Sequence, residues 1–209
     1  MKLTGEVVYL VDDDPSVREA LSELFASFRI EHVTFGSASD YVGFVRSDSC
    51  ACLVLDVQMP EISGLDLQRQ LASESGPPII FISGHGDIPS TVRAMKAGAV
   101  EFLTKPIDPQ ALVAAIRAAF IKDLEQRRKT ADLATLQRRF ALLTPREREV
   151  LPLVARGMLN KQAAAVLGIT QVTLQVHRGQ IMRKMEANSL ADLVRMAGKL
   201  GIPEPDQTL

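Results

Sequence analysis

Short apolar runs alternate with stretches of helical spacing along the first 120 residues. The strand-like runs are 7–11, 32–35, 51–56, 79–82 and 100–103. The helical stretches begin near Pro15, Ser37, Gly64, Asp87 and Asp108. Strands that alternate regularly with helices indicate a parallel sheet with helices on both faces. We therefore predict an α/β fold with five strands and five helices for this part of the chain.

The sequence predicts further details for the second and fourth of these five helices. The second helix is predicted to run from Ser37 to Val45. The fourth carries an apolar stripe of Val92, Met95 and Ala99 and is closed by Gly98.

The rest of the chain shows helical patterns only. Residues 121–140 contain no Gly or Pro and are predicted to continue the fifth helix or to follow it after a short break. Thr144-Pro145 is a typical helix start, and 160–167 is predicted as a short helix. A turn at Gly168 leads to a helix at about 171–186, whose predicted apolar side consists of Val172, Val176, Ile181 and Met185.

Reactive side chains follow four of the predicted strands where each strand ends. Asp12 and Asp13 follow the first, Asp56 ends the third, Ser83 follows the fourth and Lys105 follows the fifth. Taken alone, Asp56 is equally well interpreted as a cap of the following turn. Ligand sites of parallel sheets lie at the carboxyl ends of the strands, so these side chains are expected to share one rim.

Three crowded carboxylates repel one another unless a cation joins them, and Mg²⁺ is a hard ion that prefers oxygen ligands. A metal-neutralised Asp56 can attack a phosphorus centre and form an acyl phosphate. Lys105 offers a charge, and Ser83 a hydroxyl, to the phosphoryl oxygens. The pattern predicts a magnesium-dependent phosphoacceptor.

Residues 5–122 resemble the receiver domain of two-component response regulators. The resemblance rests on Asp12-Asp13, the segment 55–60, Gly64, the segments 83–87 and 95–99, Phe102 and Lys105-Pro106. It implies a flavodoxin-like, doubly wound sheet of strand order 2-1-3-4-5. It also implies that a sensor histidine kinase phosphorylates Asp56.

The same resemblance implies roles for further residues. Asp12, Asp13, Asp56 and the main-chain carbonyl of Gln58 would hold Mg²⁺. Ser83 and Phe102 would change rotamer when phosphate arrives and alter the surface of the fourth helix and fifth strand. The Lys105–Pro106 bond would be cis, and His85 would either tune dephosphorylation or be a turn residue without a kinetic role.

Charge divides the chain. Residues 1–120 hold 9 Lys and Arg against 16 Asp and Glu, whereas the window 150–185 holds five basic residues and no acid. This asymmetry suggests two domains with different partners, and the basic window is typical of a domain that binds nucleic acid. There is no apolar run near the roughly 20 residues of a membrane span, and we expect a cytoplasmic protein. Cys50 and Cys52 are expected to be reduced thiols.

Residues 142–197 resemble the LuxR-type helix-turn-helix domain of the NarL/FixJ response regulators. The match includes the segments 143–151, 160–162, 167–169, 176–178 and 182–184. It implies a four-helix domain that dimerises through its last helix, at about 189–199. Phosphate contacts are expected from Asn160, Lys161, Thr173 and Lys184, and groove contacts from Gln175, Val176, Arg178 and Gly179.

Four features depart from that family pattern. Pro152 lies inside the first helix of the domain and removes a hydrogen bond. Ala163 replaces a larger core residue, Gln175 replaces a groove-facing charge, and Gly179 costs helix stability of about 1 kcal/mol relative to Ala.

The predicted organisation is a receiver domain at 1–122, a long helical linker at 123–141 and an all-α DNA-binding domain at 142–209. The predicted function is a transcription regulator that becomes a homodimer and binds promoter DNA when Asp56 is phosphorylated, with no enzymatic activity beyond its own phosphorylation and dephosphorylation. Three alternatives remain: a phosphate-independent regulator, a dimerisation module with weakened DNA binding, and a phosphohydrolase that uses an aspartyl phosphate. The phosphohydrolase is disfavoured because Gln58 stands where such enzymes have a second acid.

Overall fold

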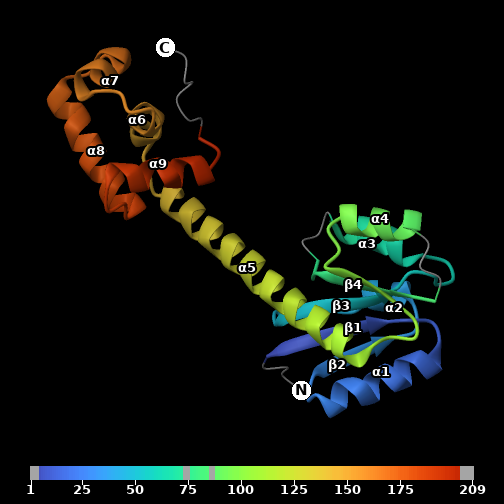
Figure 1. Ribbon diagram of the computed structural model, residues 1–209. Coiled ribbons are helices and arrows are strands. Elements are labelled where there is room, and N and C mark those ends of the chain that lie inside the picture. Colours follow the sequence, from blue (N-terminus) through green and yellow to red (C-terminus); the bar gives the residue numbers. More distant parts are fainter. Residues whose placement is uncertain (1–4, 73–75, 85–87, 203–209) are drawn as a thin grey trace. The chain divides into compact units, whose positions relative to one another are not determined.

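A computed structural model describes residues 5–72, 76–84 and 88–202 (Figure 1). The chain divides into two compact units, Met1–Arg127 and Arg128–Leu209, and each is described by itself. His85 and the predicted helix start at Asp87 lie outside the described residues. Among the residues that the structure describes, no helix has the length and hydrophobicity needed to span a bilayer.

The first unit contains a five-stranded parallel sheet of order β2-β1-β3-β4-β5. Its strands are β1 (Glu6–Val11), β2 (Glu31–Phe35), β3 (Cys50–Asp56), β4 (Ile79–Ser83) and β5 (Glu101–Thr104). The predicted fold class and strand order are therefore confirmed. All five strands start within two residues of their predicted positions.

Helices cover both faces of this sheet, as Figure 1 shows. They are α1 (Pro15–Ser27), α2 (Ala38–Val42), α3 (Gly64–Ala72), α4 (Ile88–Lys96) and α5 (Pro109–Ala141). One face packs against α1 and α5, and the other packs against α2, α3 and α4. Because the central strands are covered on both sides, successive residues such as Tyr9 and Leu10 are fully buried in opposite layers.

Two helix predictions in this unit are wrong in detail. The helix predicted at 37–45 ends at Val42, where Gly43 caps it, and Val45 is exposed. In α4, Val92 and Met95 are exposed, whereas the short side chains of Ser90 and Ala94 are buried. Val92 and Met95 of the predicted stripe are therefore directed to solvent, whereas Ala99 follows the end of α4 at Lys96 and is buried in the core.

The helix α5 is a single helix that contributes to both units, which agrees with the first of the two predicted arrangements. Within the first unit, the buried carboxylate of Asp123 accepts hydrogen bonds from the amide of Ala51 (3.1 Å) and from Nε of Arg127 (2.6 Å). The bond from Ala51 attaches α5 to the start of β3, whereas the bond from Arg127 lies within α5. Nearby, Cys50 and Cys52 are free thiols, and burial raises the pKa of Cys50 to about 11.

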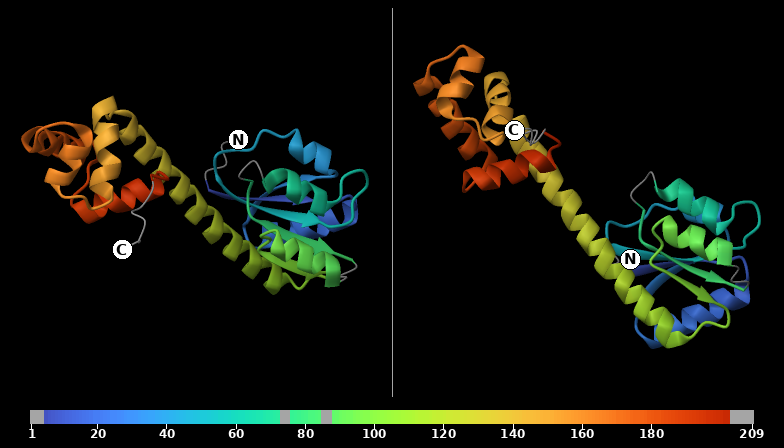
Figure 2. Two further views of the ribbon diagram at one scale, coloured as in Figure 1. Left: turned by 90° about the horizontal axis from the view of Figure 1, so that it is seen from above. Right: turned by 45° about the horizontal axis from the view of Figure 1, so that its top comes forward.

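The second unit packs four helices around one apolar core, and the two views of Figure 2 show them gathered together. The helices are α6 (Pro145–Ala155), α7 (Asn160–Leu167), α8 (Gln171–Met185) and α9 (Leu190–Lys199). Pro152 lies inside α6 without ending it. Ala163 is fully buried in the core.

The predicted apolar side of α8 is wrong for two residues. Val172 and Val176 are 72% and 58% exposed, whereas Leu174, Ile181 and Met185 are fully buried. Residues 174, 181 and 185 share one face because they are spaced by seven and four positions. The face of α8 with Leu174, Ile181 and Met185 therefore packs into the core of the second unit, and the face with Val172 and Val176 is exposed.

An ion pair between the buried Glu147 and the partly exposed Lys184 joins α6 to α8. Glu147 accepts from Nζ of Lys184 at 2.6 Å and from the amide of Thr144 at 2.8 Å, so the same carboxylate also completes the capping box of α6. Burial tends to raise the pKa of Glu147, but the bonds from Lys184 and Thr144 outweigh it and hold the pKa below its ordinary value of 4.5. A charged Glu147 therefore stabilises this unit.

We expect Glu147→Gln to lower the free energy of unfolding by about 1–3 kcal/mol at pH 7, because the substitution leaves Lys184 without its charged partner. Since the folded-state pKa of Glu147 is lowered, its contribution is present above pH 4.5 and is lost as the pH falls toward that lowered value. The difference between variant and wild type should accordingly shrink at pH 4. Urea titrations followed by far-UV circular dichroism at both pH values measure it.

Glu149→Gln is the matched control, because Glu149 is an exposed residue of the same helix in a surface ion pair with Arg146. It should change stability by less than about 0.5 kcal/mol. Equal effects of the two substitutions would contradict a stabilising role of the buried pair.

Candidate functional site

The carboxyl ends of four strands bring the predicted rim residues together. Asp12 and Asp13 follow β1, and Asp56 is the last residue of β3. Ser83 ends β4 and pairs in register with Thr104, the residue before Lys105. Parallel strands end at the same edge of the sheet, and this common edge is the reason that residues 93 positions apart become neighbours.

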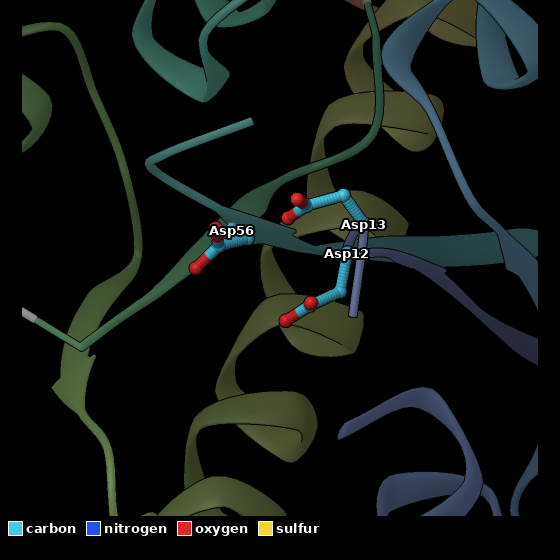
Figure 3. Close-up of side chains that lie close together, drawn as sticks. All are labelled: Asp12, Asp13 and Asp56. Carbon is cyan, nitrogen blue, oxygen red and sulfur yellow. The ribbon is translucent and has the colours of Figure 1, made fainter. Parts of the chain in front are cut away.

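Three carboxylates converge at this edge. Asp12, Asp13 and Asp56 each place an oxygen within 4.8 Å of the others, and Figure 3 shows the side chains of Asp12 and Asp13 extending toward the side of Asp56. Asp12 and Asp56 are buried and Asp13 is exposed. A set of carboxylate oxygens open to solvent on one side fits a hard cation such as Mg²⁺, which keeps part of its water shell.

Lys105 lies between two of these carboxylates. Its Nζ atom is 2.7 Å from Oδ2 of Asp12 and 3.2 Å from Oδ1 of Asp56. The bond between Lys105 and Pro106 is cis, as expected. Lys105 is therefore the cation that neutralises the buried part of the carboxylate cluster in this structure.

Burial and charge shift the ionisation of this group of residues. Burial raises the pKa of Asp56, Lys105 opposes that shift, and the charge of Asp12 adds to it, so that the pKa of Asp56 lies above its ordinary value. Burial tends to lower the pKa of Lys105, but the hydrogen bond and charge of Asp12 outweigh it, and the pKa of Lys105 is raised. Burial and the charge of Asp12 thus raise the pKa of Asp56, and attraction to the carboxylates raises the pKa of Lys105.

Main-chain amides orient the two buried carboxylates. The amide of Gln58 donates to Oδ2 of Asp56 at 3.1 Å, and the amide of Asp14 donates to Oδ1 of Asp12 at 2.9 Å. These bonds leave the remaining oxygens directed to the shared site. The expected ligation by the carbonyl of Gln58 stays a prediction.

Ser83 and Phe102 are adjacent to this rim. Ser83 is fully buried at the end of β4. Phe102 is half-buried against the sheet face that carries α4, with its ring centroid 6.2 Å from that of Phe81. Phe102 packs against the core that also contains Ala94 of α4, and the expected rotamer changes of Ser83 and Phe102 stay a prediction.

The sequence analysis did not identify Arg18. Nη1 of Arg18 donates to the main-chain oxygens of Asp12 (2.7 Å) and Asp13 (3.0 Å) and thereby holds the loop that carries both acids. Its guanidinium also lies against Gly36, whose added Cβ atom would be 3.7 Å away. The only available sequence signal was a basic residue one turn into the helix after the acids.

Gly64 lies directly against the end of β3. A Cβ atom at this position would be 2.2 Å from the main-chain oxygen of Asp56. The amide of Gly64 also donates to the oxygen of Val57 at 3.0 Å. The start of α3 therefore fits closely behind the candidate phosphoacceptor.

The residues predicted to contact DNA all lie on α7 and α8. Arg178 donates to Oδ1 of Asn160 at 3.0 Å and so connects the two helices. Lys184 is bound to Glu147. Oγ1 of Thr173 lies 2.8 Å from Oγ1 of Thr170, the residue that caps α8.

Four of the remaining predicted contacts are exposed: Lys161, Gln175, Val176 and Gly179. The last three lie on one face of α8, because Gly179 follows Gln175 by four residues and Val176 by three. The structure thus brings three of the four predicted groove residues together on a solvent-facing surface, whereas Arg178 is bonded to Asn160. Whether they contact DNA stays a prediction.

Both units match known protein families. Residues 8–117 match the response regulator receiver domain. Residues 141–197 match the luxR family of bacterial regulatory proteins.

Several curated proteins are similar over nearly the whole chain. Nodulation protein W of Bradyrhizobium diazoefficiens is 50% identical over 200 residues, which cover 95% of this chain and 88% of that protein. The response regulator protein TodT of Pseudomonas putida is 50% identical over 198 residues, covering 94% and 87%. The transcriptional regulatory protein FixJ of Azorhizobium caulinodans is 40% identical over 200 residues, covering 95% of each chain.

Two solved structures of response regulators are also similar to nearly the whole chain. The response regulator StyR is 48% identical, covers 94% of this chain and 100% of its own, and has a TM-score of 0.78. Full-length FixJ from B. japonicum is 35% identical, with coverages of 96% and 99% and a TM-score of 0.54.

We expect Gly64→Ala to lower the free energy of unfolding by about 1–3 kcal/mol, because the added methyl group overlaps the main chain of Asp56. Urea denaturation of the full-length protein measures the loss. Gly43→Ala is the control: its Cβ atom would be 3.5 Å from the oxygen of Ser39, an ordinary contact, and it should be nearly neutral. An unchanged stability of Gly64→Ala would show that α3 does not fit closely behind Asp56.

Proposed function

The chain belongs to the response regulators that combine a receiver domain with a LuxR-type DNA-binding domain, and we propose that phosphorylation of Asp56 controls its binding to DNA. The observation that carries this proposal is the convergence of Asp12, Asp13, Asp56 and Lys105 at one edge of the sheet. The phosphodonor in the cell is a sensor histidine kinase. The target is double-stranded promoter DNA, which implies a cytoplasmic location.

The proposed reaction transfers a phosphoryl group to Asp56. One carboxylate oxygen of Asp56 attacks phosphorus, the bond to the kinase histidine breaks, and its electron pair returns to the imidazole. Mg²⁺, when bound by Asp12, Asp13, Asp56 and the carbonyl of Gln58, supplies positive charge that offsets the negative charge of the transferred group. The buried position of Asp56 excludes bulk water from one side of the carboxylate.

Lys105 and Ser83 are proposed to hold the phosphorylated state. Lys105 would exchange its contact with Asp56 for a phosphoryl oxygen, which carries more negative charge than the carboxylate it replaces. The hydroxyl of Ser83 would donate to a second oxygen. Movement of Ser83 would allow Phe102 to turn inward and so change the surface of α4 and β5.

Exposed apolar side chains on α4 support a dimer as the output state. Ile88 is 78% exposed, and Val92 and Met95 are more than one third exposed. Apolar residues gathered on one exposed face commonly mark an interaction surface. We propose that phosphorylation favours homodimers of the receiver domain and that α9 supplies contacts between the DNA-binding domains.

The DNA-binding part is proposed to extend over residues 142–209, following a receiver at 1–122 and a helical linker at 123–141. Asn160, Lys161 and Thr173 are the proposed phosphate contacts, because they lie near the N-termini of α7 and α8, where anions are favoured. Lys184 keeps this role only if it leaves Glu147.

Two other functions make different predictions about Asp56. A phosphohydrolase would turn over small phosphoesters repeatedly, but Gln58 has no titrating proton to assist the second step. A regulator that needs no phosphate, or a module that mainly dimerises, would behave alike with or without a phosphodonor.

We expect a small-molecule phosphodonor and Mg²⁺ to strengthen binding of the wild-type protein to its promoter fragments and to have no effect on Asp56→Asn, which lacks the attacking carboxylate. Gel shift with both proteins, with and without the donor, measures this. Asp40→Asn removes the same charge from an exposed helix position and is the control.

Two outcomes would contradict the proposal. Wild-type affinity in Asp56→Asn, with no response to the donor in either protein, would indicate a regulator that works without phosphate. Absence of sequence-selective binding in both states would exclude the DNA-binding function.

We expect Lys105→Met to strengthen Mg²⁺ binding by on the order of tenfold, because the ammonium group competes with the dication for oxygens of Asp12 and Asp56 and repels it. Calorimetric titration with MgCl₂ alone measures the affinity. Lys122→Met is the control, since Lys122 donates to Gly98 rather than to the site. Equal or weaker Mg²⁺ binding by Lys105→Met would show that Lys105 does not compete with the metal.

A further inference from the structure

The first two turns of α8 carry no formal charge. Residues 171–177 are Gln-Val-Thr-Leu-Gln-Val-His, without Lys, Arg, Asp or Glu. In helix-turn-helix proteins, base edges are contacted mainly by the N-terminal residues of the recognition helix. The chemistry of these two turns therefore determines which bases the helix can distinguish.

One face of this part of α8 presents two valines and a glutamine. Val172 is 72% exposed, Val176 is 58% exposed and Gln175 is also exposed; the three share one face because Gln175 and Val176 follow Val172 by three and four residues. The opposite face, with Leu174 and Ile181, is fully buried in the domain core. Burial of that face fixes the rotation of α8 and presents Val172, Gln175 and Val176 outward together.

The nearest basic side chains are held by other residues. Arg178 donates to Asn160 at 3.0 Å, and Lys184 is bound to the buried Glu147 at 2.6 Å. Arg183 donates to Oε1 of Gln180 at 2.6 Å. None of these three cations lies within the first two turns, so the face of Val172, Gln175 and Val176 offers no Arg or Lys for a guanine.

The geometry points to direct recognition of A·T pairs: we infer that Gln175 selects adenine and that Val172 and Val176 contact thymine methyl groups in the major groove. A glutamine amide pairs with N6 and N7 of adenine, apolar side chains contact the thymine methyl, and guanine is normally selected by Arg or Lys. This inference rests on the proposed DNA-binding function and adds the base composition of the target.

Gly179 continues the same face one turn further along. A Cβ atom added there would meet nothing within 4 Å, so no protein contact requires the glycine. Its lack of a side chain leaves the path of the two valines and Gln175 into the groove unobstructed. The weakness that Gly179 introduces into α8 is thus compatible with close approach of the helix to DNA.

The test is selection of duplexes from a random pool by the full-length protein, treated with a phosphodonor and Mg²⁺. We expect adjacent A·T pairs at those base positions of each half-site that are enriched by the wild type but no longer enriched by variants at residues 172, 175 and 176. Replacing the selected thymines by deoxyuridine removes only the methyl groups and should weaken wild-type binding by roughly tenfold. Val172→Ala with Val176→Ala should abolish that difference between thymine and uracil.

Gln175→Arg should change the preferred base at one position of each half-site from adenine to guanine, with a preference of roughly tenfold. Val166→Ala is the control, because Val166 is 63% exposed on α7 and lies off this face. It should keep the wild-type preferences, and circular dichroism of each variant verifies that the domain is folded.

The outcomes are separable. G·C pairs at the positions that depend on residues 172, 175 and 176, or equal binding to thymine and uracil by the wild type, would overturn the inference while leaving the DNA-binding function intact. Failure of the wild type to select any sequence would overturn the proposed function on which the inference rests.

Discussion

Repulsion among three carboxylates at one edge of a parallel sheet is the constraint on which the receiver unit depends. Asp12 and Asp56 are buried beside each other, and a buried like-charged pair is costly unless a cation accompanies it. Lys105 provides that cation by contacting both. The same arrangement supports the proposed chemistry, because a carboxylate cluster that needs a cation suits Mg²⁺ and because Lys105 would offer its charge to a phosphoryl group on Asp56.

Contacts outside the carboxylate cluster hold it in place. Arg18 binds the main-chain oxygens of the loop that carries Asp12 and Asp13, and Gly64 allows α3 to fit against the main chain of Asp56. Neither residue has a reactive group directed at the site. Both residues act on the main chain that carries the carboxylates. Such contacts are needed because the carboxylates of Asp12, Asp13 and Asp56 repel one another and would otherwise separate.

The DNA-binding unit uses a buried ion pair for a different purpose. The contact between Glu147 and Lys184 joins α6 to α8 and so helps to set the rotation of α8 about its own axis. One consequence is that a lysine assigned to phosphate contact by family resemblance is committed to the fold. A second is that the face of Val172, Gln175 and Val176 carries no formal charge, and the inferred base preference rests on their amide and methyl groups.

By itself, the sequence determined the strands, most helix limits and the convergence of Asp12, Asp56 and Lys105, because apolar periodicity and the strand-end rule for parallel sheets are local or topological properties. Tertiary structure alone decided which face of a helix is buried. Val172 and Val176 of α8 and the apolar residues of α4 have helical spacing but face solvent. The buried positions are taken instead by Ser90 and Ala94 in α4 and by Leu174 and Ile181 in α8, which face the packed neighbouring elements. Tertiary structure also decided the role of Arg18. Its guanidinium binds main-chain oxygens, which every residue has, so that no sequence pattern marks its partners.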